Sequence, residues 1–508
     1  MIYLITLLYV NVLGVSFAFT ISGNSIVFAT RIEIFGFSGR KNNENTSLFT
    51  HTQTVSPYQN ASYDNRDEKK TETSLEELCS YLKVTPANLL YLSSQSGDGE
   101  RGVFLNSSVR KDDILLNIPL SSCIRDDEPP LWYDNYKSSH RNEDFDDDNF
   151  HYNPNKWPAR LAASLLDLQI RADIEGQNNS SDLNKGLYKW LSMMPDEALL
   201  RASLPIHWPE DIVAQAKCTA LELSIDASYF ARAEAMADLK EAVKMKSNHI
   251  EWKENKLEEH DVSKMAESIF DIVQTRSCRA ERLDGIQLRP SLRVLAPIFD
   301  FINHGSRRHD GIGSANAYFG LEEVDDGDLS LVVRARNDID ANEEVLIDYG
   351  DSARPAWRCL ASYGFVPNYR LTSPDDELDE GEEDESVAEI FMDGTRYEVG
   401  SHTVPYEMVE AASIALLEEN QGPEVLDDSI GDGNENPSVN LLTPEVALRI
   451  AKRVSDASFQ LLLDPAGNEE RNHHGSILIA KQLSGALRWS QHKVLLNCAI
   501  GLRDYAGR

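Results

Sequence analysis

Several apolar segments of this sequence end in side chains that suit ligand binding. The segment DFINHG carries Asp300, Asn303 and His304 at the end of the apolar run 294–301, where a water-facing loop has no obvious need of them. An amide and an imidazole both form directional hydrogen bonds. Loops at the ends of rigid strands are where binding groups usually lie. Taken alone, the segment fits a turn whose polar residues bond local backbone, and a binding site is the alternative.

Three other segments share this feature. They are GERGVF (99–104), TRSC (275–278), and EEVLIDYG through ASYGF (343–365). Each segment alone also fits a structural role, because Asn-His pairs often bond local backbone in turns and tyrosines often lie in cores with a bonded hydroxyl. GERG is not predicted to hold a phosphate, since neither G-x-G-x-x-G nor G-x-x-x-x-G-K-[ST] occurs there.

The elements around these segments alternate between β-like and helical patterns. Short β-like runs occur in 97–124 and again in 291–349, and helical patterns cover 158–174, 227–246 and 262–277. We expect the apolar run 294–301 to be the strand that positions the residues of DFINHG. The pattern predicts a mostly-β unit that a group of helices interrupts.

The C-terminal part follows an acidic segment, 375–385, that is typical of a solvated loop. One β-like piece, AEIFMDGTRYEV, comes next, and helical patterns fill most of the remainder. We therefore expect an α+β fold. Its expected parts are a mostly-β domain at 74–125 and 281–366, a helical insertion at 126–280, and a helical region at 367–508.

The bulk composition excludes some partners. The chain has 508 residues and a formal charge of −34, and it shows no basic stripe suited to phosphate contacts. Because such a surface repels nucleic acid, we expect no nucleic-acid partner. The six cysteines form no C-x-x-C or spaced ligand set, so neither a structural zinc site nor a disulfide framework is indicated.

The amino terminus has the composition of a targeting segment. An apolar stretch leads to Ser16-Phe17-Ala18, a small-x-small cleavage pattern, so residues 1–18 are predicted to be a signal peptide or a signal anchor. Residues 19–73 are transit-like, being rich in Ser and Thr and poor in acids near their start. Together they predict a plastid location through a bipartite presequence. Secretion or membrane anchoring is the alternative, with membrane attachment only if the segment stays uncleaved.

In their order, the four segments resemble the SET-domain methyltransferases. The helical insertion and the tail after YGFVPNY resemble the class typified by the plant Rubisco large-subunit methyltransferase, and the Trp157-led segment WPARLAASLL extends this resemblance into the insertion. It covers about residues 75–370 well and the tail loosely. The fold it implies is a SET domain with a helical insertion and a helical C-terminal substrate-binding domain.

The resemblance implies S-adenosylmethionine as cofactor and a set of site residues. Tyr349 matches the catalytic tyrosine beside the transferred methyl group, and Tyr318 and Tyr363 match walls of a substrate channel. The residues matched to the cofactor site are Gly99, Arg101, Arg276, Asp300, Asn303, His304, Tyr349, Tyr363 and Phe365. Arg276 would hold the cofactor carboxylate, a task that suits a guanidinium. TRSC departs from the family's Ser-Arg-x-Phe, because Cys278 replaces the aromatic residue.

The activity that the resemblance implies is methyl transfer to a lysine side chain of a non-histone protein, by a monomer. A free lysine has a pKa of about 10.4, and an apolar channel beside a sulfonium would lower it so that the neutral amine attacks. Transfer to a histidine nitrogen is an alternative. A non-catalytic protein that binds a partner on the same scaffold is another. A metal site built on His304, His309 and Asp310 lacks a helix-borne His-x-x-x-His and has the weakest support.

Overall fold

The computed structural model describes most of the chain in two compact units, Met1–Thr54 and Val55–Arg508. The residues that it describes are 11–12, 15–22, 25–31, 75–86, 88–93, 101–134, 157–175, 181–195, 197–246, 259–285, 291–305, 315–324, 328–350, 355–367, 387–421, 442–463 and 475–507.

The first unit contains three short antiparallel strands. They are β1 (Asn11–Val12), β2 (Val15–Ser22) and β3 (Ser25–Arg31), and β2 pairs with both of the others. Most of the predicted transit-like segment, 19–73, lies outside the described residues. Among the residues that the structure describes, no helix is both long enough and apolar enough to cross a membrane.

The second unit opens with a helix at residues 75–82 and several short strands, which form small sheets at its mostly-β end. The predicted runs GVFL and ILLNIP become β5 (Gly102–Leu105) and β6 (Ile114–Pro119). β4 (Leu90–Ser93) pairs antiparallel with β5, and β7 (Ile124–Arg125) pairs with β9 (Leu292–Leu295), which also pairs with β8 (Cys278–Ala280).

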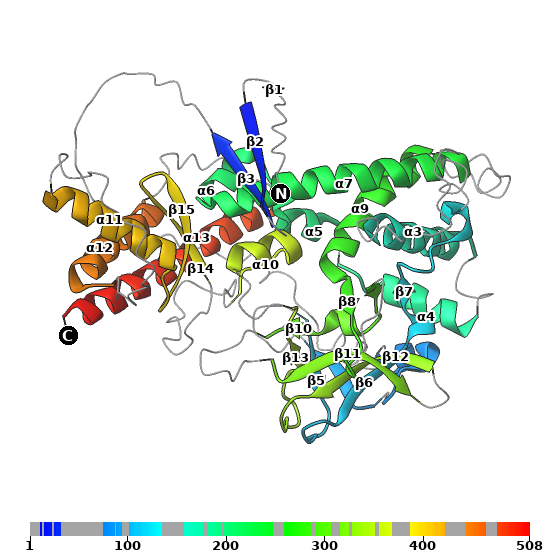
Figure 1. Ribbon diagram of the computed structural model, residues 1–508. Coiled ribbons are helices and arrows are strands. Elements are labelled where there is room, and N and C mark those ends of the chain that lie inside the picture. The colour runs from blue at the N-terminus through cyan, green and yellow to red at the C-terminus, as the bar shows by residue number, and fades with distance from the viewer. Residues whose placement is uncertain are drawn as a thin grey trace, which may run out of the picture. The chain divides into compact units, whose positions relative to one another are not determined.

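A five-stranded sheet gathers segments from both ends of the SET-like sequence. Its order is β10-β13-β11-β12-β6, with β10 at Asn303–His304, β13 at Leu346–Ile347, β11 at Ala317–Val324 and β12 at Asp328–Ala335. β10 and β13 are parallel, whereas β11, β12 and β6 pair antiparallel (Figure 1). The parallel pair brings DFINHG beside EEVLIDYG, although about 40 residues separate them in the sequence.

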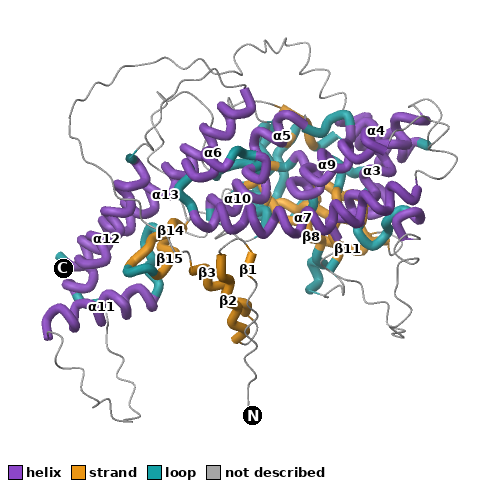
Figure 2. Tube along the Cα trace, turned by 90° about the horizontal axis from the view of Figure 1, so that it is seen from above, coloured by secondary structure: helices purple, strands orange, loops and turns teal. Residues whose placement is uncertain are grey.

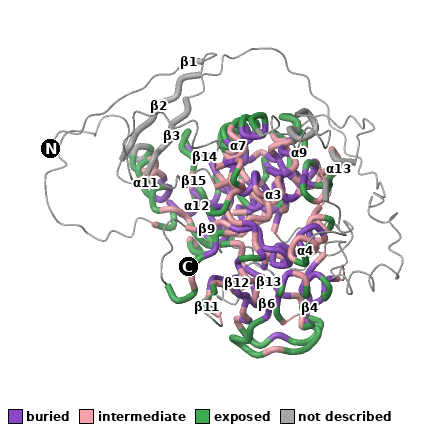
Figure 3. The backbone as a smooth tube through the Cα atoms, turned by 90° about the vertical axis from the view of Figure 1, so that its right-hand side faces the viewer, coloured by how far each residue is buried: buried purple, intermediate pink, exposed green. Residues whose placement is uncertain are grey.

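Helices fill the insertion between the two groups of strands. They are α3 (Trp157–Glu175), α4 (Asp182–Leu191), α5 (Glu197–Ser203), α6 (Glu210–Gln215), α7 (Thr219–Lys246) and α9 (Glu259–Arg276), with a 3-10 turn, η4, at Pro205–His207. The pattern predicted α3 and α9 closely, whereas α7 begins eight residues before the predicted start at 227. α3 packs against α7 and α9, and the outward face of α7 is exposed (Figure 3).

The run 294–301 is not one strand, so that expectation was wrong. β9 ends at Leu295, and a 3-10 turn, η5 (Phe299–Phe301), leads into β10. Pro297 lacks an N–H for a ladder, and buried Ile298 adopts φ 72° and ψ −45°, which is an outlier for a β-branched residue. Such backbone strain persists only where packing imposes it and is common at binding sites. This bend at Pro297 and Ile298 redirects the chain, so that DFINHG does not continue along the line of β9.

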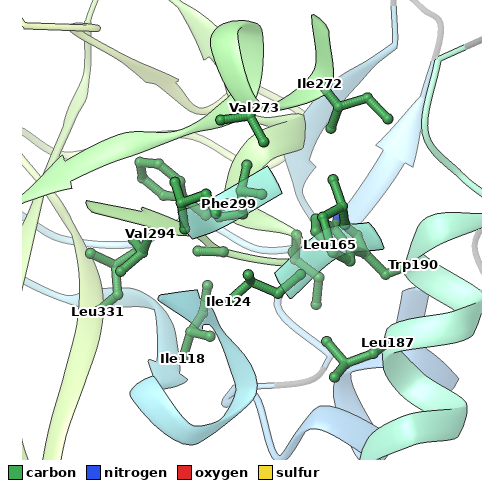
Figure 4. Packing of buried hydrophobic residues seen from close by; sticks show 14 of the residues in the cluster. Ile118, Ile124, Leu165, Leu187, Trp190, Ile272, Val273, Val294, Phe299 and Leu331 are labelled. Carbon is green, nitrogen blue, oxygen red and sulfur yellow. The ribbon is translucent and has the colours of Figure 1, made fainter. Parts of the chain in front are cut away.

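A single large core holds the mostly-β part against the insertion. Val294 and Phe299 lie in it with Leu331 of the sheet, Leu165 of α3 and Trp190 of α4 (Figure 4). This core buries both sides of the segment that leads to DFINHG. Burial of apolar surface stabilises a fold by about 25 cal/mol per Å². Because the residues before DFINHG are packed on both sides, this burial holds them in one position.

The C-terminal part combines a helix, a hairpin and three more helices. These elements are α10 (Ala356–Tyr363), β14 (Val387–Met392), β15 (Thr395–Gly400), α11 (Tyr406–Gln421), α12 (Pro444–Leu462) and α13 (Gly475–Ala506). The single β-like piece predicted here is a hairpin that turns at Asp393-Gly394, where both residues have positive φ.

The long helix α13 joins two apolar clusters. Its first half packs on the insertion and on α10 through Leu483 and Leu487, and its second half packs on α12 and the hairpin through Leu495 (Figure 2). The α+β fold class is confirmed.

Candidate functional site

Four aromatic rings from two segments meet beside β10. His304 and Tyr349 have ring centroids 5.2 Å apart, and Tyr349 and Tyr363 have centroids 5.0 Å apart. Phe365 completes the group at 5.8 Å from His304 and 6.1 Å from Tyr363. All four side chains are only partly buried, so their rings are accessible to a ligand. We call these four residues the aromatic cluster.

Backbone geometry explains why these rings meet. His304 lies on β10 opposite Ile347 of β13, two residues before Tyr349. Tyr363 ends α10, and Gly364 follows in the left-handed conformation at φ 81°, as is usual for the residue after a helix. A Cβ at Gly364 would lie 2.7 Å from Ser203 Oγ, so the turn that presents Phe365 requires glycine.

Three hydrogen bonds fix the aromatic cluster. The Tyr349 hydroxyl donates to the Ile302 carbonyl at 2.8 Å, and the Tyr363 hydroxyl donates to the Tyr349 carbonyl at 3.4 Å. The Tyr349 N–H donates to His304 Nδ1 at 3.3 Å, so a neutral His304 carries its proton on Nε2. The hydroxyl of Tyr349 is thus held at a fixed point next to DFINHG.

Asn303 lies beside the aromatic cluster and is oriented through its Nδ2. That nitrogen donates to the Glu344 carboxylate Oε1 at 2.8 Å and to the Arg101 carbonyl at 3.2 Å. Both partners are acceptors only, which decides the orientation of the amide. Among the described residues, Oδ1 of Asn303 receives no hydrogen bond, and it is not sealed from solvent. It is an acceptor open to a ligand.

Arg276, at the end of α9, reaches the same motif. Its Nη1 donates to the Asp300 carbonyl at 2.6 Å and lies 4.0 Å from Asp300 Oδ2. The Asp300 carboxylate is buried, accepts from Trp190 Nε1 at 3.1 Å through Oδ1, and has no hydrogen-bond partner at Oδ2. Burial raises the pKa of Asp300 to about 6, and the opposing charge of Arg276 limits that rise.

The raised pKa of Asp300 predicts a stability that depends on pH. Since free Asp has a pKa of about 3.9, the unfolded chain ionises first as the pH rises. Wild type should therefore lose up to about 3 kcal/mol of unfolding free energy between roughly pH 4 and pH 6. In Asp300→Asn this loss should vanish, so the variant gains on wild type across the window. Urea denaturation from pH 4 to 7 measures the difference, and parallel pH profiles would refute the raised pKa.

The remaining predicted site residues lie in different places. Arg101 borders the site through its carbonyl, while its guanidinium donates to the Met193 carbonyl at 2.8 Å and stacks over Phe301. Gly99 lies outside the described residues. Tyr318 directs its hydroxyl to Asp112 at 3.2 Å, and none of its described contacts joins the aromatic cluster. The structure thus brings together Arg101, Arg276, Asp300, Asn303, His304, Tyr349, Tyr363 and Phe365.

Three contributing residues were not among the predicted site residues. Glu344 anchors Asn303, Trp190 anchors Asp300, and Gln274 donates to the Ala361 carbonyl at 2.9 Å, which ties α9 to the helix that carries Tyr363. Each of these contacts joins segments that are distant in sequence. Of the three, only Glu344 lay within one of the four segments that carry the predicted site residues.

A metal centre receives no support from the described residues. Within them, no group of three or more His, Cys, Asp or Glu side chains could hold a metal ion. His309 and Asp310 of the predicted metal alternative lie outside the described part of the chain.

Comparison with known proteins gives a family match over the middle of the chain. Residues 100–350 match the SET domain family. Similar solved structures include the SET domain of LSMT bound to lysine and AdoHcy, with 14% identity and a TM-score of 0.43 over 86% of this chain and 91% of that chain. Rubisco LSMT bound to AdoMet is similar at 14% identity and a TM-score of 0.42, over 85% and 92%. No curated protein sequence matches the chain.

The matched region contains His304 and Tyr349 of the aromatic cluster, whereas Tyr363 and Phe365 lie beyond its end at residue 350. In the described residues, Arg276 engages only Nη1 in a hydrogen bond and keeps donors for a carboxylate, and Asn303 offers an acceptor for an amine. The partly exposed rings add faces for an apolar or cationic group. S-adenosylmethionine, which SET methyltransferases use, carries a carboxylate, amines, a ring and a sulfonium, and the residues present fit it. Residues 100–350 of this chain match the SET domain family, whose cofactor is S-adenosylmethionine, and the site residues suit that cofactor.

Proposed function

We propose that the protein is a protein-lysine N-methyltransferase with a non-histone protein substrate. The observation that carries the proposal is the position of the Tyr349 hydroxyl. The hydroxyl is held on the carbonyl of Ile302, which directly precedes Asn303, the residue that would meet the cofactor, and the Tyr349 ring lies within the aromatic cluster. This arrangement suits the in-line transfer of a methyl group from a bound cofactor to a target amine that enters between the rings of the aromatic cluster.

The residues divide into cofactor-holding and amine-guiding groups. Arg276 would hold the cofactor carboxylate, Asn303 an N–H donor of the cofactor, and His304 with Phe365 a ring face. The cofactor supplies an activated methyl group on a sulfonium. Tyr349 and Tyr363 would line the path of the target amine, because their edge-to-face ring contact and the hydrogen bond from the Tyr363 hydroxyl to the Tyr349 carbonyl hold this side of the site rigid.

Catalysis on this account comes mainly from alignment and from the protonation state of the amine. Well-oriented displacements gain on the order of 7 to 11 kcal/mol over reactions between free partners. Tyr349, Tyr363 and Phe365 present apolar ring faces, which disfavour the charged ammonium through desolvation. A neutral amine then needs no strong base beside it. The hydroxyl and carbonyl oxygens of the aromatic cluster can accept its N–H groups and direct its lone pair.

The test is methyl transfer followed by identification of the modified residue. The full chain is incubated with tritiated S-adenosylmethionine and a protein lysate, and labelled proteins are hydrolysed to amino acids. Label in methyllysine supports the proposal, whereas label in methylhistidine would favour the histidine alternative. Cofactor binding without any label would indicate a non-catalytic partner-binding protein.

We further propose a plastid location for the protein, carried by residues 1–73. The support is the signal-like segment that precedes a transit-like composition. A fluorescent fusion of residues 1–75 should accumulate in plastids, and secretion or membrane retention of the fusion would refute this address.

A further inference from the structure

Glu344 lies where three segments of the SET domain meet. Its backbone forms an antiparallel bridge with Phe104, and its carbonyl accepts from Asn316 Nδ2 at 2.8 Å. Its carboxylate Oε1 accepts from Asn303 Nδ2 at 2.8 Å. One residue thus connects the GERGVF segment, the DFINHG segment and the strand that leads to Tyr349.

The space around this carboxylate depends on a glycine. A Cβ at Gly102 would overlap Glu344 Oε1 and would lie 2.9 Å from its Cδ. Gly102 has no requirement for positive φ, so the need for glycine here is steric. The side chain of Glu344 is therefore packed directly against the backbone that follows Arg101, whose carbonyl is the second acceptor for Asn303.

These two acceptors determine what the amide can recognise. With both Nδ2 hydrogens directed to Glu344 and to the Arg101 carbonyl, the exchange of Oδ1 and Nδ2 would place three acceptors together. Oδ1 is left as an acceptor that solvent or a ligand can reach. A ligand group at this point must therefore donate an N–H or an O–H.

We infer that Glu344 is a positioning residue for the cofactor site. Its carboxylate holds the Asn303 amide so that Oδ1 accepts an N–H of S-adenosylmethionine, and Gly102 provides the space for that carboxylate. Glu344 acts through Asn303 and not by contact with the methyl group. The inference rests on the cofactor that the proposed function uses.

The experiment is calorimetric titration of the full chain with S-adenosylmethionine, with thermal unfolding as the fold check. Glu344→Ala should raise the Kd on the order of tenfold, because a hydrogen bond to a charged group that orients Asn303 is lost. Glu344→Gln can still accept from Nδ2 and should stay within about threefold of wild type. Glu343→Ala removes the neighbouring exposed carboxylate and should bind as wild type does.

A double-mutant cycle with Asn303→Ala separates positioning from general damage. Once Asn303 is absent, Glu344→Ala should add less than about twofold to the Kd, since both changes remove the same contact. Should Glu344→Ala fail to fold, Glu344→Met keeps the volume, removes the acceptor and takes its place in the cycle. Equal loss in Glu344→Gln and Glu344→Ala, additive losses in the cycle, or a normal Kd in Glu344→Ala would each overturn the inference. If wild type itself fails to bind, the proposed function is wrong.

Discussion

Tyr349→Phe should abolish most methyl transfer while leaving cofactor binding nearly intact. The change removes only the hydroxyl that is held on the Ile302 carbonyl and keeps the ring between His304 and Tyr363. Loss of one group that is oriented toward the reacting atoms typically lowers kcat on the order of 10² to 10³-fold. The Kd for S-adenosylmethionine should change by less than about threefold. Turnover with tritiated cofactor and calorimetry measure the two quantities separately.

A matched control exists in the C-terminal helices. Tyr505 also donates its hydroxyl to a backbone carbonyl, that of Leu442 at 2.7 Å, far along the chain from the SET domain. Tyr505→Phe therefore makes the same chemical change and should retain wild-type turnover. Unchanged turnover in Tyr349→Phe would remove the catalytic role assigned to Tyr349, and a matching loss in Tyr505→Phe would point to a general effect on stability.

Asn303→Ala should weaken cofactor binding far more than it weakens the fold. The Kd for S-adenosylmethionine is expected to rise by a factor of ten or more. The change removes the Oδ1 acceptor and also the hydrogen bond from Asn303 to Glu344 that orients this side of the site. The free energy of unfolding should fall by only about 1 to 2 kcal/mol, since Glu344 stays partly solvated and can bind water. Calorimetry and urea denaturation give the two values.

Asn337→Ala is the control for this change, because Asn337 is exposed and bonds only the neighbouring Asp338 carbonyl among the described residues. It should alter neither quantity. If Asn303→Ala unfolds at much lower denaturant while a folded fraction binds cofactor normally, Asn303 is a structural turn residue and its site role is wrong.

Sequence order was sufficient to assemble most of the site. Arg276 ends a helix that the apolar periodicity predicted, and Asn303 and Tyr349 lie in segments that were marked by their polar and aromatic residues. The parallel pairing of β10 with β13, which brings these two segments together, was not predicted. The helices of the insertion were predictable because their buried positions recur at helical spacing. The position of His304 against Tyr349 follows from the same pairing.

The rest depended on side-chain direction and on contacts between distant segments. Tyr318 was placed on a strand correctly, yet its hydroxyl points to Asp112, and a strand pattern alone does not decide such a contact. Trp190 meets Asp300 across 110 residues, for which no local pattern exists. The Asp393-Gly394 hairpin carried a local signal, since Asp-Gly between β-like runs is typical of a tight turn.

The most direct test of the account is a crystal structure of the full chain with S-adenosylhomocysteine, the product left after methyl transfer. The predicted result is ligand density that contacts Asn303 Oδ1 and the Arg276 guanidinium, with its sulfur facing the rings of Tyr349 and Tyr363. Density elsewhere, or a ligand that leaves Arg276 and Asn303 untouched, would contradict the assignment of this site.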